Sequence, residues 1–265
     1  MHADSAYVMG QGHRVCQDYA RSGLECMHPF NFGYAIVSDG CSGSPDTDVG
    51  ARLLALRMER ALKGWDCIDA ERMADWVRSM LRNEFYGLNP MAFDATLVTA
   101  TAFVDPGHTS IITATVMGDG VFAVQRPGED VRIWTVDVPD GHPRYLNYLN
   151  DDRRRSAVEM GDPWQVYGPS GVELETHFVE AFVHQEKDVP AGTVVAVFSD
   201  GVRSFVDADR QPVPVDQVVG ELMSFKGMMG VFVQRRMQGF LRAAAQRGWR
   251  HDDDLAMAAV HVGEP

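Results

Sequence analysis

Apolar residues along the chain follow two different spacings. Alternation of apolar and polar residues, or a short apolar run between turn residues, predicts a β-strand, whereas apolar residues three and four positions apart predict an amphipathic helix. Strand patterns are frequent, and they cover residues 3–9, 32–38, 96–104, 110–117, 121–125, 131–136, 174–184, 194–198 and 255–260. The sequence therefore predicts a strand-rich protein.

Helical spacing occurs in three regions. The first predicted helix begins at Thr47-Asp48, where either residue can cap it. The second follows Asp69, a suitable cap, and its apolar face consists of Met73, Trp76, Val77, Met80 and Leu81. The third covers residues 215–246 and is interrupted near Gly227 and Gly230. We expect the first two helices to pack on a sheet.

Short turns join the predicted strands between residues 96 and 138, as at Gly118-Asp119-Gly120. These connections predict an antiparallel meander and exclude a doubly wound parallel sheet, which needs a crossover helix between successive strands. Residues 139–172 are instead one long segment rich in Pro, Gly, Tyr, Asn and Asp. We expect a single domain over residues 1–265 with a surface excursion at about 139–172 that can hold a short helix. The excursion either covers a functional site or is a solvated connection.

Composition and charge limit the function. The 265 residues are 45% hydrophobic, enough to bury a core, and the formal net charge of −13 argues against nucleic-acid and anionic-membrane partners. No run approaches the roughly 18 apolar residues of a membrane helix, and the N-terminus lacks the features of a signal peptide. The four cysteines form no Cys-x-x-Cys pair, which favours free thiols in a reducing compartment. We therefore expect a cytoplasmic protein.

Acidic residues occupy the ends of several predicted strands. Two apolar runs lead into Ser-Asp-Gly sequences at Asp39 and Asp200, and the other acids at strand ends or turns are Asp18, Asp119 and Asp253. A turn explains each one singly, because Asp-Gly is common in hairpins. Together they offer the oxygen ligands that Mg²⁺ and Mn²⁺ select, and two ions about 4 Å apart would activate a water beside a phosphoryl group. The acids thus predict a metal site centred on Asp39.

Six short motifs follow one another in a fixed order. They are His13-Arg14-Val15-Cys16-Gln17-Asp18, Val37-Ser38-Asp39-Gly40, Phe93-Asp94-Ala95-Thr96-Leu97, Met117-Gly118-Asp119-Gly120, Phe198-Ser199-Asp200-Gly201 and Asp253-Asp254-Leu255-Ala256. In order and spacing they resemble the motifs of the type 2C metal-dependent protein serine/threonine phosphatases, the PPM superfamily, as in its bacterial single-domain members. The resemblance covers nearly the whole chain. It implies an α+β fold, a four-layer α-β-β-α sandwich of two antiparallel sheets flanked by helices, with two Mn²⁺ or Mg²⁺ ions in a cleft at one end.

The resemblance also implies roles for individual residues. By motif position, Asp39 would bridge both ions, and Asp200 and Asp253 would complete the ligands of the first, which makes these three acids the catalytic residues. The backbone carbonyl of Gly40 would serve the second ion, as would Asp18 directly or through water. Asp119 together with Asp200 would hold a weaker third ion.

Three positions depart from the family pattern. Where the family carries an arginine that clamps the substrate phosphate, this chain has His13. His13 and the adjacent Arg14 become the candidates for phosphate binding, although a shift of one residue in a strand turns a side chain to the other face. Gln17 replaces a carboxylate, and the loss of this negative charge should weaken the binding of the second ion. Cys41 replaces a histidine that acts as general acid, and a thiol with an ordinary pKa near 8.5 suits that role poorly.

The leading hypothesis is hydrolysis of phosphoserine and phosphothreonine esters on a phosphorylated protein by a metal-activated water. A second hypothesis, motivated by His13 and Cys41, is a phosphatase-fold regulatory module that binds a partner with little turnover. A third is a phosphatase of small phosphorylated metabolites whose pocket is built by residues 139–172. The sequence indicates no oligomeric state.

Overall fold

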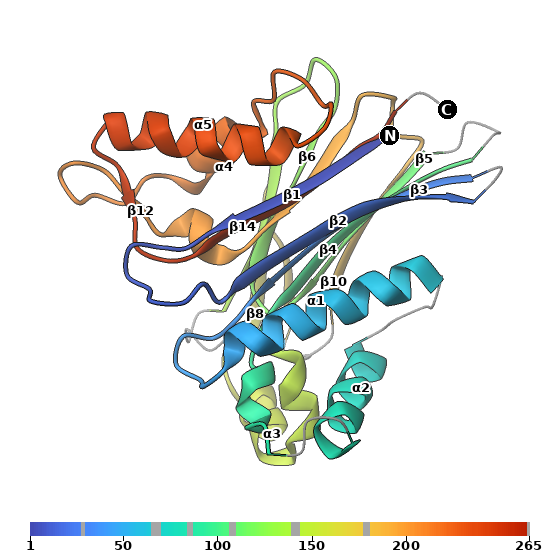
Figure 1. The fold of residues 1–265 in the computed structure, drawn as a ribbon, viewed down its shortest axis with the longest axis vertical. Coiled ribbons are helices and arrows are strands. Elements are labelled where there is room, and N and C mark those ends of the chain that lie inside the picture. The colour runs from blue at the N-terminus through green and yellow to red at the C-terminus, as the bar shows by residue number, and fades with distance from the viewer. Residues whose placement is uncertain are drawn as a thin grey trace.

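The computed structural model describes residues 1–27, 30–64, 70–83, 87–105, 110–138, 144–176 and 181–263. Two antiparallel sheets lie face to face, and helices cover the outer face of each, as Figure 1 shows. This arrangement confirms the predicted α+β sandwich of four layers. None of the helices in the described ranges is long and apolar enough to cross a membrane.

The larger sheet has seven strands in the order β1-β14-β11-β6-β7-β8-β9. Its strands are β1 (His2–Val8), β6 (Gly120–Gln125), β7 (Arg132–Asp137), β8 (Trp164–Gly168), β9 (Gly171–Thr176), β11 (Val194–Phe198) and β14 (Leu255–His261). Strand β11 is buried along its whole length, because the second sheet covers one face and helices cover the other. A strand covered on both faces carries a continuous apolar run, which is why this segment was predictable.

The smaller sheet has five strands in the order β10-β5-β4-β3-β2. They are β2 (Asp18–Met27), β3 (Phe30–Asp39), β4 (Leu97–Val104), β5 (Ser110–Met117) and β10 (Phe182–Lys187). Small apolar residues, mostly valine and alanine such as Ala100, Ala114 and Val260, fill the space between the two sheets. A separate two-stranded pair joins β12 (Phe205–Val206) to β13 (Arg250–His251).

Each sheet has its own helices. The smaller sheet packs against α1 (Thr47–Gly64), and the larger sheet against α4 (Val215–Met223) and α5 (Phe232–Gln246). The helix α2 (Ala70–Asn83) shares the hydrophobic cluster of α1 but lies mainly against residues 146–150, not directly on the sheet as predicted. The break between α4 and α5 falls at the glycines where the sequence predicted it. Helix α1 begins at Thr47 as predicted, whereas the proposed α2 cap, Asp69, lies outside the described residues.

Four short elements complete the fold. They are α3 (Asp152–Met160) and the 3₁₀ helices η1 (Pro90–Phe93), η2 (Leu146–Asn150) and η3 (Asp200–Arg203). The first residues of the predicted excursion, 139–143, lie outside the described residues. The remainder, residues 144–172, contains η2, the expected short helix as α3, and also strand β8, which pairs with β7 in the larger sheet.

The predicted meander over residues 96–138 is wrong in one respect. The chain leaves the smaller sheet after β5 and enters the larger sheet at β6, so β5 and β6 do not pair. The crossing uses Gly118 and Gly120, whose φ values of 97° and 148° lie in a region that favours glycine. The single strand predicted over 174–184 is also wrong, because β9 and β10 belong to different sheets. Strand β2 was missed because the apolar and polar residues of its sequence, DYARSGLECM, do not alternate regularly, and because it lies at the edge of a sheet.

Candidate metal centre

Strand ends from both sheets meet at one edge of the sandwich. In the smaller sheet, β2 begins at Asp18 and β3 ends at Asp39, and these two residues face each other across the ladder. In the larger sheet, Phe198 pairs with Val121 and with Met257, so β11 ends where β6 and β14 begin. Antiparallel pairing therefore places the residues before β6 and β14 beside those after β11.

A cavity of about 220 Å³ opens at this edge. Its lining consists of Asp39, Gly40, Cys41, Ser42, Thr96, Asp119, Tyr145, Asp200 and Asp253. Five of the six predicted metal-contacting residues thus line one cavity. The sixth, Asp18, is only 1% exposed and lies behind it, in side-chain contact with Asp39.

Burial and like charge shape the electrostatics of the cavity. Burial, followed by the carboxylates of Asp18 and Asp200, raises the pKa of Asp39 well above its ordinary value. Burial likewise raises the pKa of Asp18, against hydrogen bonds from Ser199 and Asp39. Burial and Asp200 raise the pKa of Asp119 to about 7, although Arg203 opposes this shift. Such shifts mean that the ionised carboxylates lack sufficient positive charge nearby.

The donor set fits a hard divalent cation. Oδ1 of Asp18 and Oδ1 of Asp200 are buried and have no hydrogen-bond partner, which is costly for a carboxylate unless a cation or a water occupies the site. The described residues contain no group of three Asp, Glu, His or Cys side chains already arranged around an ion. Mg²⁺ retains several waters, so two carboxylates and a backbone carbonyl can suffice for each ion.

Ser199 is a site residue that the sequence analysis did not assign. Its Oγ donates to Oδ2 of Asp18 at 2.6 Å and accepts from the backbone N–H of Ala256 at 2.9 Å. The side chain therefore ties the first residue of β2 to β14 of the other sheet. The repeated Ser-Asp-Gly pattern was the only signal that the serine mattered.

The loop before β2 is held by Asp254, next to the predicted ligand Asp253. Asp254 accepts from the backbone N–H of Gly10 at 2.7 Å and from that of Gln17 at 2.6 Å, and it is almost completely buried. Its Oδ2 also lies 3.0 Å from Nδ1 of His13. Both ends of the loop are thus attached to the start of β14.

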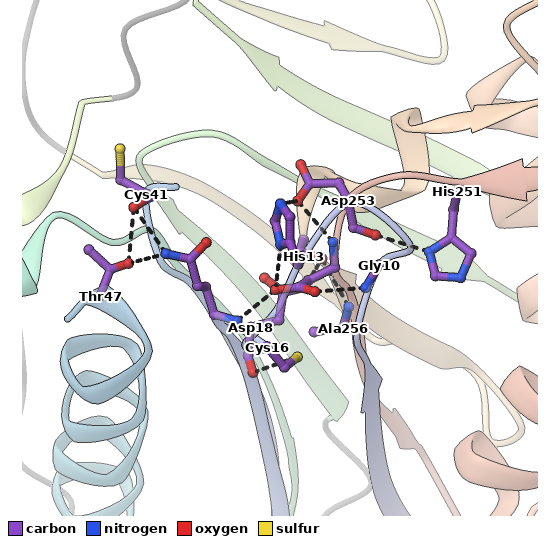
Figure 2. A network of polar contacts seen from close by, with 12 residues as sticks. Gly10, His13, Cys16, Asp18, Cys41, Thr47, His251, Asp253 and Ala256 are labelled. Atoms are coloured by element: carbon purple, nitrogen blue, oxygen red, sulfur yellow. Dashed lines mark hydrogen bonds and ion pairs between the residues drawn. The ribbon is translucent and has the colours of Figure 1, made fainter. Parts of the chain in front are cut away.

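The two predicted phosphate-binding residues lie on this loop, outside the cavity lining. Nε2 of His13 is 3.4 Å from Oδ1 of Asp253, and Figure 2 shows the ring beside that carboxylate. Burial lowers the pKa of His13, but the carboxylates of Asp254 and Asp253 outweigh this and raise it. Arg14 is exposed. A phosphate-binding role for either residue stays a prediction.

Gln17 faces the beginning of α1 and the turn after Asp39. Its Nε2 donates to Oγ1 of Thr47 at 2.6 Å and to the carbonyl of Cys41 at 3.3 Å, and Oγ1 of Thr47 in turn donates to the same carbonyl at 2.9 Å. Figure 2 shows Thr47, at the beginning of α1, beside Cys41. The residue that replaces a family carboxylate therefore fixes the turn.

The excursion contributes Tyr145 to the cavity. The Tyr145 hydroxyl contacts the thiol of Cys41, and burial followed by this contact raises the pKa of Tyr145. The segment is attached through Asp94, which is 1% exposed and accepts from Ser44 Oγ at 3.0 Å, Asn147 Nδ2 at 2.9 Å and Arg154 at 2.6 Å. Of the two interpretations of the excursion, the one in which it covers a site agrees with these contacts.

Two stacked antiparallel sheets with a carboxylate-lined cavity at one edge define the architecture. A family model described as protein phosphatase 2C matches residues 10–242 of this sequence. The chain therefore belongs to the protein phosphatase 2C family of hydrolases. No protein of curated function matches it.

Solved structures share the fold. The phosphatase domain of SpoIIE from Bacillus subtilis, with a fragment of its regulatory domain, matches at a TM-score of 0.57 and 14% identity, covering 100% of this chain and 62% of that one. The RsbU and RsbW domains of a Mycobacterium tuberculosis protein match at a TM-score of 0.55 and 13% identity, covering 100% of this chain and 62% of that one. The SiaA PP2C domain of Pseudomonas aeruginosa matches at a TM-score of 0.53 and 10% identity, covering 98% of this chain and 85% of that one. The chain thus spans about 62% of the length of the first two.

Proposed function

We propose that this protein is a metal-dependent phosphatase that hydrolyses phosphoserine and phosphothreonine esters on protein substrates. The observation that carries the proposal is the cluster of partly buried, mutually repelling carboxylates around one cavity, with Oδ1 of Asp200 unpartnered. A protein that used this edge only for packing would gain by neutral residues there, because unpaired buried carboxylates destabilise a fold.

Asp39, Asp200 and Asp253 would hold one ion, and Asp39 with the carbonyl of Gly40 a second, while Asp18 would act directly or through water. Asp119 with Asp200 would hold a weaker third. Mn²⁺ or Mg²⁺ bound there supplies a Lewis acid that lowers the pKa of water and neutralises phosphoryl oxygens.

The chain's own residues perform three further tasks. Ser199 holds Asp18 by a hydrogen bond to Oδ2, which leaves Oδ1 of Asp18 without a hydrogen-bond partner and available to an ion or to its water. The Gln17–Thr47–Cys41 contacts fix the turn that carries Gly40. The hydroxyl of Tyr145 is a hydrogen-bond donor at the cavity wall and can orient a leaving-group oxygen, a role that the Cys41 thiol fills poorly.

The test is Mn²⁺-dependent hydrolysis of a phosphoserine peptide and of p-nitrophenyl phosphate by the purified protein. We expect Asp39→Asn to abolish turnover while leaving the fold intact, because Asp39 lies at the centre of the cluster. The matched control is Asp130→Asn, an exposed acid between β6 and β7, which should keep full activity.

Activity that survives Asp39→Asn or excess chelator would contradict the proposal. Phosphopeptide binding without turnover would favour the regulatory module, and faster turnover of free phosphoserine or nucleotides than of peptides would favour a metabolite phosphatase.

A further inference from the structure

A second cavity lies at the junction of α4 and α5, and its charge is unlike that of the rest of the molecule. The cavity measures about 500 Å³ and is lined by Lys226, Gly227, Phe232, Arg235, Arg236 and Gly239. Among the residues that the structure describes, no acidic one belongs to this lining. The metal centre is lined by carboxylates, so the two cavities are of opposite charge.

The sequence around the cavity is equally biased. Residues 224–250 contain six of the 24 Lys and Arg residues and none of the 37 Asp and Glu residues. In a chain with a formal net charge of −13, this stretch is a local concentration of positive charge. Clusters of one sign raise the local concentration of ions of the other sign.

The charge of Arg236 is only partly compensated, because the nearby charge of Glu221 opposes the effect of burial on the pKa of Arg236 without outweighing it. The residue is half-buried, burial lowers its pKa, and its Nε donates to the backbone carbonyl of Glu221. The carboxylate of Glu221 is already engaged by Arg247, at 2.6 and 2.9 Å. Within the described ranges, no carboxylate lies at ion-pair distance from Arg236. A half-buried guanidinium beside two like charges favours an anionic ligand.

Two glycines keep the cavity open. A Cβ atom added at Gly227 or Gly239 would meet nothing within 4 Å. Gly239 lies in the middle of α5, where glycine costs roughly 0.5–1 kcal/mol relative to alanine. Packing does not require a glycine there, and because Gly239 lines the cavity, a larger side chain at this position would occupy part of it.

The helix N-terminus is not the source of this site. The first free N–H groups of α5, those of Val233 and Gln234, donate to Oδ2 of Asp4 at 2.7 and 3.1 Å. Asp4 lies on β1, four residues before Val8 at the edge that carries the metal centre. At about 3.3 Å per residue, this places the beginning of α5 roughly 13 Å from that edge.

We propose that this cavity is a binding site, separate from the metal centre, for an anion that carries a phosphate group on an organic body. Arg235 and Arg236 supply the planar donors that pair with phosphate oxygens, Lys226 adds a third positive charge, and Phe232 provides an apolar wall for the body of the ligand. The phosphate can come from a nucleotide or from a phosphorylated residue of another protein.

The experiment is a titration of the metal-free protein, kept in chelator so that phosphate esters are not hydrolysed. The probes are ATP and a phosphoserine peptide, and the readouts are the backbone amide NMR signals of Gly227 and Gly239. We expect saturable shifts that weaken with salt, because exposed charges are screened beyond about 10 Å at 0.1 M ionic strength. Preference for ATP would assign the site to nucleotides, and preference for the peptide to phosphoproteins.

Two test variants, each with a matched control, make the result specific. Arg235→Gln with Arg236→Gln should weaken binding at least about tenfold, since charge-assisted hydrogen bonds are the stronger class. Arg242→Gln, an exposed arginine of α5 outside the lining, should bind normally. Gly239→Leu should fill the cavity and abolish binding while the helix is kept. Its control, Gly220→Leu, places the same side chain at an open position of α4 outside the lining and should leave binding unchanged.

Equal shifts in the double variant and in Arg242→Gln would overturn the proposal, as would no saturable shift with either probe. Both results are independent of catalysis, because turnover by the metal-loaded protein is measured separately at the other cavity.

Discussion

Among single residues, Asp254 should contribute most to holding the N-terminal loop against the metal centre. We expect Asp254→Asn to lower the free energy of unfolding by about 1–3 kcal/mol, the cost of unsatisfied buried polar groups. Both carboxylate oxygens accept backbone N–H groups, from Gly10 and Gln17. An asparagine offers one oxygen and would direct an NH₂ group at the other donor. Urea unfolding of the metal-free protein measures the change.

The neighbouring acid provides the control. Asp252→Asn makes the same substitution two positions earlier at an exposed side chain, and it should change stability by less than about 0.5 kcal/mol. Similar losses in both variants would show that the net charge of this acidic stretch matters, and not the contacts of Asp254.

The sequence made some site residues predictable and concealed others. Asp39 and Asp200 follow buried apolar runs, so their position at the end of a strand was visible. Asp254 stands in a run of three acids, and nothing in that run indicates which one is buried. Tyr145 comes from a polar segment whose path depends on a contact between Asp94 and Arg154, and such long-range pairs leave no local pattern.

At the scale of elements, the α3 segment should depend on one ion pair. Arg154 of α3 reaches the buried carboxylate of Asp94 and also lies 3.9 Å from the centre of the Tyr148 ring. We expect Arg154→Gln to destabilise the protein by about 3 kcal/mol, because removing one partner leaves a buried charge. Turnover should fall too, since Tyr145 and the Cys41–Ser44 turn are both attached near Asp94. Thermal unfolding and phosphopeptide kinetics measure the two effects.

Arg153→Gln is the matched control, because that side chain is exposed on the same helix and should be neutral. Adding Asp94→Asn to Arg154→Gln should restore part of the lost stability, since the buried charge is then absent. If the two substitutions were additive, so that the double variant lost the sum of the two single losses in unfolding free energy, the two residues would not be coupled.

Element existence was easier to predict than element pairing. The strands β5 and β11 match their predicted ranges, because periodicity within a segment reports whether its faces are buried. Which strands pair depends on contacts between segments that lie far apart in the sequence. The Gly118–Gly120 turn looks like a hairpin turn in sequence, yet it carries the chain from one sheet to the other, and that crossing is what brings Asp119 to the cavity.

For the whole molecule, an ion cluster joins the two sheets at one side. Glu186 lies on β10 of the smaller sheet, and its Oε2 accepts from Arg126 and Arg132, which belong to the β6–β7 region of the larger sheet, each at 2.8 Å. Its Oε1 lies 3.0 Å from Nε2 of His184. The cluster therefore adds a charged connection between layers that meet mainly through apolar side chains.

This cluster should make stability depend on pH in an acidic window. Burial alone would raise the pKa of Glu186, but the hydrogen bonds from Arg132, His184 and Arg126 outweigh it and lower the pKa to about 2 from its ordinary 4.5. The unfolded chain then binds the proton more readily than the folded protein. The stabilisation is complete above about pH 4.5 and is lost as pH falls towards 2. Its size is about 2 kcal/mol, reduced by solvent around the partly exposed arginines.

Comparison with Glu186→Gln isolates this contribution, because all other titrating groups are common to both proteins. Urea unfolding at a series of pH values should give a difference in unfolding free energy that is constant from neutral pH to about pH 5 and then shrinks as the pH falls. A variant at the exposed Glu129, Glu129→Gln, should show no such change. A difference that stayed constant down to pH 3 would mean that Glu186 keeps an ordinary pKa and that the arginines stabilise the sheets by packing instead.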